Sequence, residues 1–91
     1  MEVRDYVINR LTEESYYILS EMSKDHVALQ GETLSWFQSL IAKAEAANNQ
    51  ARVLAATVVM KAYAEEELTP SFDPMSLSRR IDQGIQEMVN S

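Results

Sequence analysis

Few residues in this chain have side chains and spacing that could carry out chemistry. His26 is the only histidine, and there is no cysteine, which excludes a thiol nucleophile, a disulfide and a thiolate metal site. A catalytic or metal-binding histidine needs partners, and the adjacent Asp25 would point elsewhere on a helix because neighbouring positions do not share a face. The Glu-x-x-His spacing of di-iron bundles is also missing. The sequence therefore predicts no catalytic, metal or cofactor site, and places His26 at the surface or at a helix boundary.

Two pairs of adjacent aromatic residues are candidates for binding. In Tyr16-Tyr17 and in Trp36-Phe37 the neighbouring rings would lie about 100° apart on a helix, so one ring can be buried while the other faces away. Tyr17 and Phe37 lie on or beside apolar stripes, which leaves Tyr16 and Trp36 more exposed. Tyrosine and tryptophan are enriched among binding hot spots. We interpret the rings first as core residues, and alternatively Tyr16 and Trp36 as anchors for a partner.

Two charged clusters could also meet a partner. Glu65, Glu66 and Glu67 fall at the carboxyl end of a predicted helix, where the helix macrodipole disfavours negative charge. They could receive a basic partner, pair with Arg79 and Arg80 of the last helix, or form a solvated helix end. Two arginines in an acidic chain make a poor match for nucleic-acid phosphates, so Arg79 and Arg80 do not indicate nucleic acid. All five residues are candidate partner-binding residues.

The charge balance limits the partners. The net charge is −6, and acidic residues are spread along the chain without a basic half. Nonspecific binding to DNA, RNA or an anionic membrane needs clustered lysine and arginine, so we expect no direct nucleic-acid or membrane partner. An acidic partner surface is disfavoured for the same reason, whereas a basic one is allowed. Because the N-terminus carries charges of both signs and no long apolar stretch follows, we expect no signal peptide, no membrane span and a cytoplasmic location.

The composition predicts an all-α fold. The 91 residues suffice for one small domain, with 46% hydrophobic and 24% charged residues. The segment 32–69 contains no glycine or proline and holds nearly all of the alanines. Alanine, leucine, glutamate, lysine, glutamine and methionine lose little conformational freedom in a helix. We therefore predict a single helical domain over 1–91, a small bundle of three helices, or alternatively four, with one long Ala-rich central helix.

Apolar periodicity gives the expected helix boundaries. We predict a helix over about 2–23, a long helix over about 33–68 and a C-terminal helix over about 74–90. The long helix has one ambiguous point. Asn48 can belong to a continuous packing stripe, where a single asparagine can fix the register, and this is the interpretation we adopt. Alternatively, Asn48-Asn49 forms a turn between two helices.

The long segment also carries a stripe that alternates three- and four-residue steps, which predicts packing along another helix. The members of the stripe are Leu34, Phe37, Ile41, Ala44, Asn48, Ala51, Ala55, Val58 and Ala62. The part 53–64 is apolar nearly all round, so it must be covered on most sides. Since a chain this short leaves little to cover both features, we expect a homodimer with the 34–62 stripe contributing. The C-terminal helix could dock on the central helix or on another chain.

These patterns favour a non-enzymatic protein that acts through protein–protein interaction, as a regulator, inhibitor, chaperone or complex subunit. One alternative is an acidic decoy that occupies a nucleic-acid-binding site on another protein, motivated by Glu13-Glu14 and by Glu65-Glu66-Glu67. Another is a small ligand bound at a subunit interface, with Tyr16, Trp36 or arginines facing a cleft. Strong salt dependence of partner binding would separate the decoy from the hydrophobic interpretation.

Overall fold

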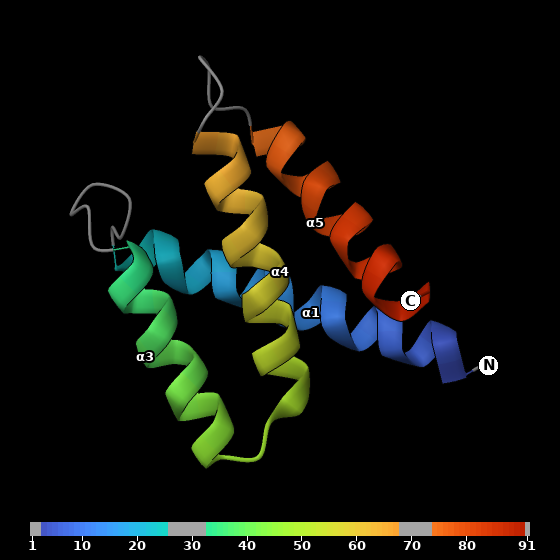
Figure 1. The fold of residues 1–91 in the computed structure, drawn as a ribbon, viewed down its shortest axis with the longest axis horizontal. Coiled ribbons are helices and arrows are strands. Elements are labelled where there is room, and N and C mark those ends of the chain that lie inside the picture. The colour runs from blue at the N-terminus through green and yellow to red at the C-terminus, as the bar shows by residue number, and fades with distance from the viewer. Residues whose placement is uncertain (1–2, 26–32, 68–73, 91) are drawn as a thin grey trace.

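The computed structural model describes residues 3–25, 33–67 and 74–90, and the described residues form helices and turns (Figure 1). Helix α1 spans Val3–Lys24, α3 spans Thr33–Ala46, α4 spans Gln50–Glu67 and α5 spans Pro74–Asn90. The all-α prediction is confirmed for this part of the chain. The helices number four within it, the larger of the two predicted numbers.

Helix α4 lies at the centre of the bundle. It packs against α1, α3 and α5; among the described helices, α3 packs closely on α4 alone, and α1 also contacts α5. Figure 1 shows α3 and α5 on opposite sides of α4, with α1 crossing behind. The buried residues of α4 are Ala55, Ala56, Val58, Val59, Ala62, Tyr63 and Glu66. The expectation that segment 53–64 must be covered on most sides is therefore confirmed, and its small residues let neighbouring helices approach closely.

The long Ala-rich helix predicted over 33–68 is not confirmed, because the chain turns at Asn48 and Asn49. Asn48 has a φ of 57°, a left-handed conformation that asparagine tolerates better than most residues. The backbone N–H of Asn49 donates to the carbonyl of Ala44 over 2.8 Å, which ends α3 in a Schellman-type cap. The side-chain Oδ1 of Asn49 then accepts from the N–H of Arg52 over 3.1 Å and caps the start of α4. The turn, our alternative interpretation, is what the structure contains.

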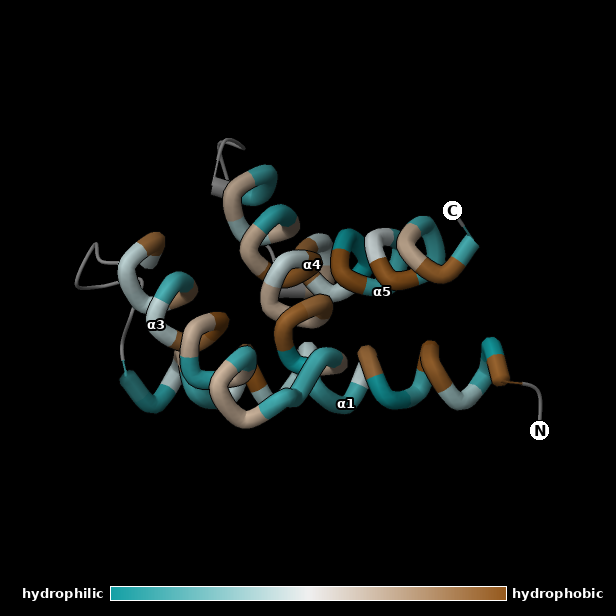
Figure 2. Tube along the Cα trace, turned by 60° about the horizontal axis from the view of Figure 1, so that its bottom comes forward, coloured by the Kyte–Doolittle hydropathy of each residue, from teal (hydrophilic) through white to brown (hydrophobic). Residues whose placement is uncertain are grey.

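One hydrophobic core joins all of these helices. Its largest fully buried apolar side chains are Phe37 of α3, Leu11 and Ile18 of α1, and Ile81 and Ile85 of α5. Figure 2 shows hydrophobic residues of α4 and α5 concentrated where these helices approach α1. Burial of these side chains in one core explains why apolar residues recur at three- and four-residue spacings within the helices.

Helix α5 docks on α4 and α1 of its own chain, which is the first of the two arrangements expected for it. Leu77, Ile81 and Ile85 are its buried residues. Gly84 lies against α4, where an added Cβ would stand 3.0 Å from Cγ1 of Val58. The glycine therefore permits a close approach of the two helices.

The stripe that motivated a homodimer is largely covered within a single chain. Phe37, Ala44, Ala55 and Ala62 are buried by their own neighbours, whereas Leu34, at the start of the stripe, is 63% exposed. Uncovered apolar surface along 34–62 is thus no longer an argument for self-association, which stays a prediction.

Candidate functional site

A buried carboxylate joins α1 to α4. The side chain of Glu14 is only 6% exposed, with Oε1 lying 2.9 Å from Nη1 of Arg10. Its Oε2 accepts a hydrogen bond from Nε of Arg52 over 2.8 Å. The guanidinium of Arg52 also lies over the ring of Tyr17, 4.3 Å from its centroid, in a cation–π contact. Arg52 is therefore held between a carboxylate and an aromatic face of α1.

A second buried carboxylate joins α4 to α5. Glu66 is 2% exposed and accepts a hydrogen bond from Nε of Arg80 over 2.7 Å, while Glu65 accepts one from Nη1 over 2.8 Å. The bond to Glu66 is the largest cause that raises the pKa of Arg80 above its ordinary value. Because folding raises this pKa, the stabilisation is fully present below the ordinary pKa of arginine and is lost only as the pH rises through the raised one. Changes of pH around neutrality leave Arg80 charged.

Helix α3 is attached differently from the other helices. Within the described residues it makes no ion pair to another helix. Its Trp36 donates a 2.8 Å hydrogen bond from Nε1 to Oδ2 of Asp25, just after α1. The indole also meets the buried ring of Phe37 edge to face, with the centroids 5.3 Å apart and an interplanar angle of 86°. Since the backbones of α1 and α3 do not pack on each other, space remains between the two helices.

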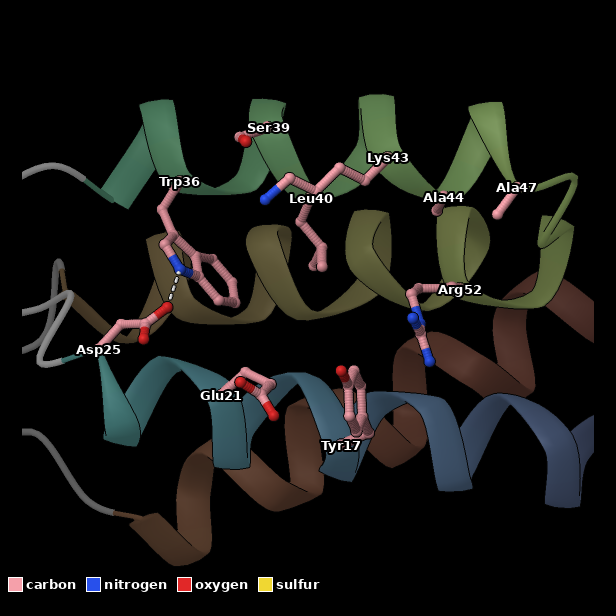
Figure 3. A pocket seen from close by; sticks show the side chains of 10 residues that line it. All are labelled: Tyr17, Glu21, Asp25, Trp36, Ser39, Leu40, Lys43, Ala44, Ala47 and Arg52. Atoms are coloured by element: carbon pink, nitrogen blue, oxygen red, sulfur yellow. Dashed lines mark hydrogen bonds between the residues drawn. The ribbon is translucent and has the colours of Figure 1, made fainter.

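This space is a cleft of about 340 Å³, bounded by α1, α3 and the start of α4 (Figure 3). Figure 3 shows Trp36 and Leu40 reaching from α3 toward α1, with Tyr17 and Glu21 reaching from α1 toward α3. The other lining residues are Asp25, Ser39, Lys43, Ala44, Ala47 and Arg52. From Trp36 to Ala44, the first and last lining residues within α3, the cleft follows this helix for about 12 Å at 1.5 Å per residue, or about two helical turns. It combines apolar walls with charged groups of both signs.

The structure places the aromatic candidates at different sites. Trp36 is half-buried in the cleft. Tyr16 lies elsewhere: it is 44% exposed, and its hydroxyl is 2.6 Å from Oγ of Ser78, which links α1 to α5. Phe37 is fully buried as expected, but Tyr17 is 42% exposed and lines the cleft with Trp36. Only one of the two predicted anchors therefore belongs to this site.

The charged candidates are also separated from the cleft. Glu65 and Glu66 pair with Arg80, the second of the three arrangements considered from the sequence. Arg79 is exposed on α5 and does not line the cleft. The side chain of Glu67 and the whole of His26 lie outside the described residues. The structure thus brings together Glu65, Glu66 and Arg80, but as a helix–helix contact.

Sequence reasoning missed most of the cleft. Tyr17, Glu21 and Asp25 recur at four-residue intervals, as do Trp36 and Leu40, so each set was readable as one face of a helix. What the sequence did not indicate is that these two faces lie opposite each other. That pairing depends on how α1 and α3 both pack on α4.

A second hollow lies between the first half of α1 and the start of α4. It has a volume of about 310 Å³, and its lining is mostly apolar: Tyr6, Val7, Arg10, Leu11, Ala51 and Leu54. Tyr6 and Leu54 are exposed there. This hollow lacks the varied polar groups of the α1–α3 cleft, which we therefore take as the candidate site.

Comparison with protein-family models, curated proteins and solved structures gives no match for this chain. Among the described residues, no three acidic or histidine side chains gather closely enough to hold a metal ion. A search of the same residues finds no helix with the length and hydropathy needed to cross a bilayer.

Proposed function

We propose that this chain is a non-enzymatic protein-interaction module, acting as a regulator, inhibitor, chaperone or complex subunit, and that a partner protein docks in the cleft between α1 and α3. The observation that carries the proposal is the position of Tyr17 and Trp36 on opposite walls of that cleft. Partly exposed aromatic side chains that become buried on binding are typical interface anchors.

The dimensions of the cleft suit a segment of a protein. A groove about two turns long between two helices can receive one face of an amphipathic helix, which is a recurrent mode of peptide recognition. Leu40 supplies an apolar wall between the aromatic positions, and Ala44 and Ala47 leave room at the other end. The position of Trp36 here, with its indole already hydrogen-bonded to Asp25, gives a preorganised anchor.

The decoy alternative gains less support. An acidic mimic of nucleic acid must present its carboxylates to solvent, but Glu14 and Glu66 are buried and paired with arginines. These two residues belong to the acidic clusters that motivated the alternative.

A small-molecule site is the second candidate, and one observation favours it. The cleft volume of about 340 Å³ falls at the lower end of the range for ligand pockets, about 300–1,000 Å³. The lining comes from one chain, so such a site would not need the subunit interface expected from the sequence.

Site-specific photo-cross-linking in a lysate of the cells that produce the protein tests the proposal. A photoreactive phenylalanine analogue is placed at Ser39, an exposed residue of α3 in the cleft, and in a matched control at Gln86, an exposed residue of α5. We expect a discrete protein adduct from position 39, none from position 86, and loss of the adduct when Trp36→Ala is added.

The mass of the adduct also tests the predicted homodimer. One chain has a mass of 10.3 kDa, so an adduct of twice that mass would identify the partner as a second copy. A different mass would identify another protein. Equal labelling from both positions, or no protein adduct from position 39, would contradict docking in the cleft.

A further inference from the structure

We infer that the segment bound between α1 and α3 is acidic and amphipathic, with a large apolar side chain between Tyr17 and Trp36 and a carboxylate beside Lys43. The inference rests on the proposed function, because it names the chemistry of the partner for that same cleft. It reverses the expectation of a basic partner, since Glu65 and Glu66 already pair with Arg80 and are not a free acidic surface.

The apolar part of the segment is indicated by the walls of the cleft. Tyr17 projects from α1 while Trp36 and Leu40 project from α3 toward it (Figure 3). The Nε1 donor of Trp36 is already used by Asp25, so the indole offers mainly apolar surface to a ligand. An aliphatic or aromatic side chain matches this surface better than a polar one.

The acidic part is indicated by the charges that line the cleft. Asp25 accepts the hydrogen bond from Trp36, and Oε1 of Glu21 lies 3.5 Å from Nζ of Lys24. The carboxylates of the lining therefore have partners within the chain. The side chain of Lys43 makes no hydrogen bond or ion pair within the part of the chain that the structure describes, and the residue is exposed.

Arg52 adds a second source of donors. Its Nε is bonded to Glu14, but a guanidinium has five N–H donors, so others stay available at the cleft. Its stacking over Tyr17 fixes the planar group in position. The cleft thus has unused cationic donors at Lys43 and Arg52, and a carboxylate is the protein group that complements such donors best.

The net charge of −6 opposes the approach of an acidic segment at long range. At about 0.1 M salt, however, charges farther apart than about 10 Å are largely screened. A carboxylate in contact with Lys43 is within that distance. The pair should therefore act mainly on the lifetime of the complex, with the overall charge slowing association.

Selection of peptides from a random 12-residue display library tests this inference. The immobilised targets are the wild-type chain, Lys43→Glu and, as a matched control, Arg79→Glu. Arg79 is exposed on α5, and its substitution changes the net charge by the same amount. A synthetic copy of the most enriched peptide is then titrated while the emission of Trp36, the only tryptophan, reports occupancy of the cleft.

We expect wild type and Arg79→Glu to enrich peptides that carry Asp or Glu close to a large apolar residue. Lys43→Glu should select against those acids and bind the wild-type peptide at least about tenfold more weakly, since like charges would be brought together. Circular dichroism confirms that each variant is folded. Two results would overturn the inference and leave the proposed function standing. In the first, peptides shift the Trp36 emission but are not enriched in Asp or Glu. In the second, Lys43→Glu enriches acidic peptides as strongly as wild type does. If no enriched peptide changes the emission of Trp36, both the inference and the proposed docking in the cleft are contradicted.

Discussion

The indole Nε1 of Trp36 donates a 2.8 Å hydrogen bond to Oδ2 of Asp25, and this bond ties the first turn of α3 to the end of α1. The backbones of these two helices do not otherwise pack together, so the bond spans one end of the cleft. By contrast, buried arginine–carboxylate pairs join α1 to α4 and α4 to α5. Helix α3 is therefore the helix with the weakest attachment to the rest of the bundle.

Removing this bond should loosen α3 selectively. Asp25→Ala is expected to cost about 1 kcal/mol or less, because the bond is exposed to solvent. Hydrogen exchange followed by mass spectrometry should show faster exchange in α3 than in wild type, with α4 and α5 unchanged. The emission of Trp36 should shift to the red.

Asp25→Asn is the matched variant, because its side-chain carbonyl can still accept the bond. It should restore slow exchange in α3. If Asp25→Ala leaves α3 unchanged, or accelerates all helices equally, the bond does not have the role assigned to it.

The buried carboxylate of Glu14 should contribute far more to stability than its neighbour. Glu14→Ala leaves Arg10 and Arg52 without their shared partner and should lower the free energy of unfolding by about 2 kcal/mol. This value is below that for a fully buried pair, since both arginines are partly exposed to solvent. Urea denaturation measures the change.

The control for this prediction is Glu13→Ala, whose side chain is 73% exposed and lies 4.0 Å from Arg10. It should change the stability by about 0.5 kcal/mol or less. Equal effects of the two substitutions would show that burial of Glu14 is not what stabilises the contact between α1 and α4.

A buried hydroxyl on α1 should be dispensable. Oγ of Ser15 is buried and has no hydrogen-bond partner, so it loses its hydration on folding without compensation. Ser15→Ala is expected to stabilise the protein by about 1 kcal/mol. Ser20→Ala, at an exposed position of the same helix, corrects for the higher helix propensity of alanine. Thermal unfolding measures both variants. A larger increase in stability for Ser20→Ala than for Ser15→Ala would argue against an unsatisfied buried hydroxyl at Ser15.

The close approach of α4 and α5 depends on Gly84. In Gly84→Ala the new Cβ would stand 3.0 Å from Cγ1 of Val58, so we expect destabilisation of about 1 kcal/mol despite the better helix propensity. In a Val58→Ala background the clash is relieved, and the same substitution should stabilise by up to about 1 kcal/mol. A double-mutant cycle in denaturant measures the coupling. Additive effects would mean that the two residues do not limit the helix spacing.

The sequence was sufficient to predict much of the buried face of α1 and of α5. Leu11 and Ile18 lie seven residues apart, Ile81 and Ile85 lie four apart, and both spacings keep side chains on one helical face. The apolar composition of 53–64 likewise predicted a helix enclosed by others. These features are local, so they could be read without knowledge of the neighbours.

The break at Asn48 could not be decided from local sequence. Alanine-rich segments on both sides favour a helix, and asparagine fits either a helix interior at some cost or a left-handed cap. The turn is favoured by a tertiary gain: α3 can fold back so that Phe37 is buried in the same core as Ala55 of α4. Within one chain, a continuous helix would have left this surface exposed.

One residue of the candidate site, Trp36, was among the partner-binding candidates named from the sequence. Trp36 was recognised because its neighbour Phe37 had to occupy the buried face, and that reasoning holds at this position. The same reasoning named Tyr16, but the hydroxyl of Tyr16 is hydrogen-bonded to Ser78 on α5 and the residue lies outside the cleft. Lys43 had no local signal, because its significance comes from the helix that lies across the cleft.

The most direct test is the dissociation rate of the non-covalent complex between this chain and the partner that cross-linking identifies. We predict that Trp36→Ala raises this rate by about thirtyfold, corresponding to about 2 kcal/mol for a buried aromatic anchor. Tyr16→Ala, which removes the other aromatic candidate outside the cleft, should change it by about twofold or less. Both variants are first shown to be folded by circular dichroism. A large effect of Tyr16→Ala with none of Trp36→Ala, or no effect of either, would contradict partner binding in the α1–α3 cleft.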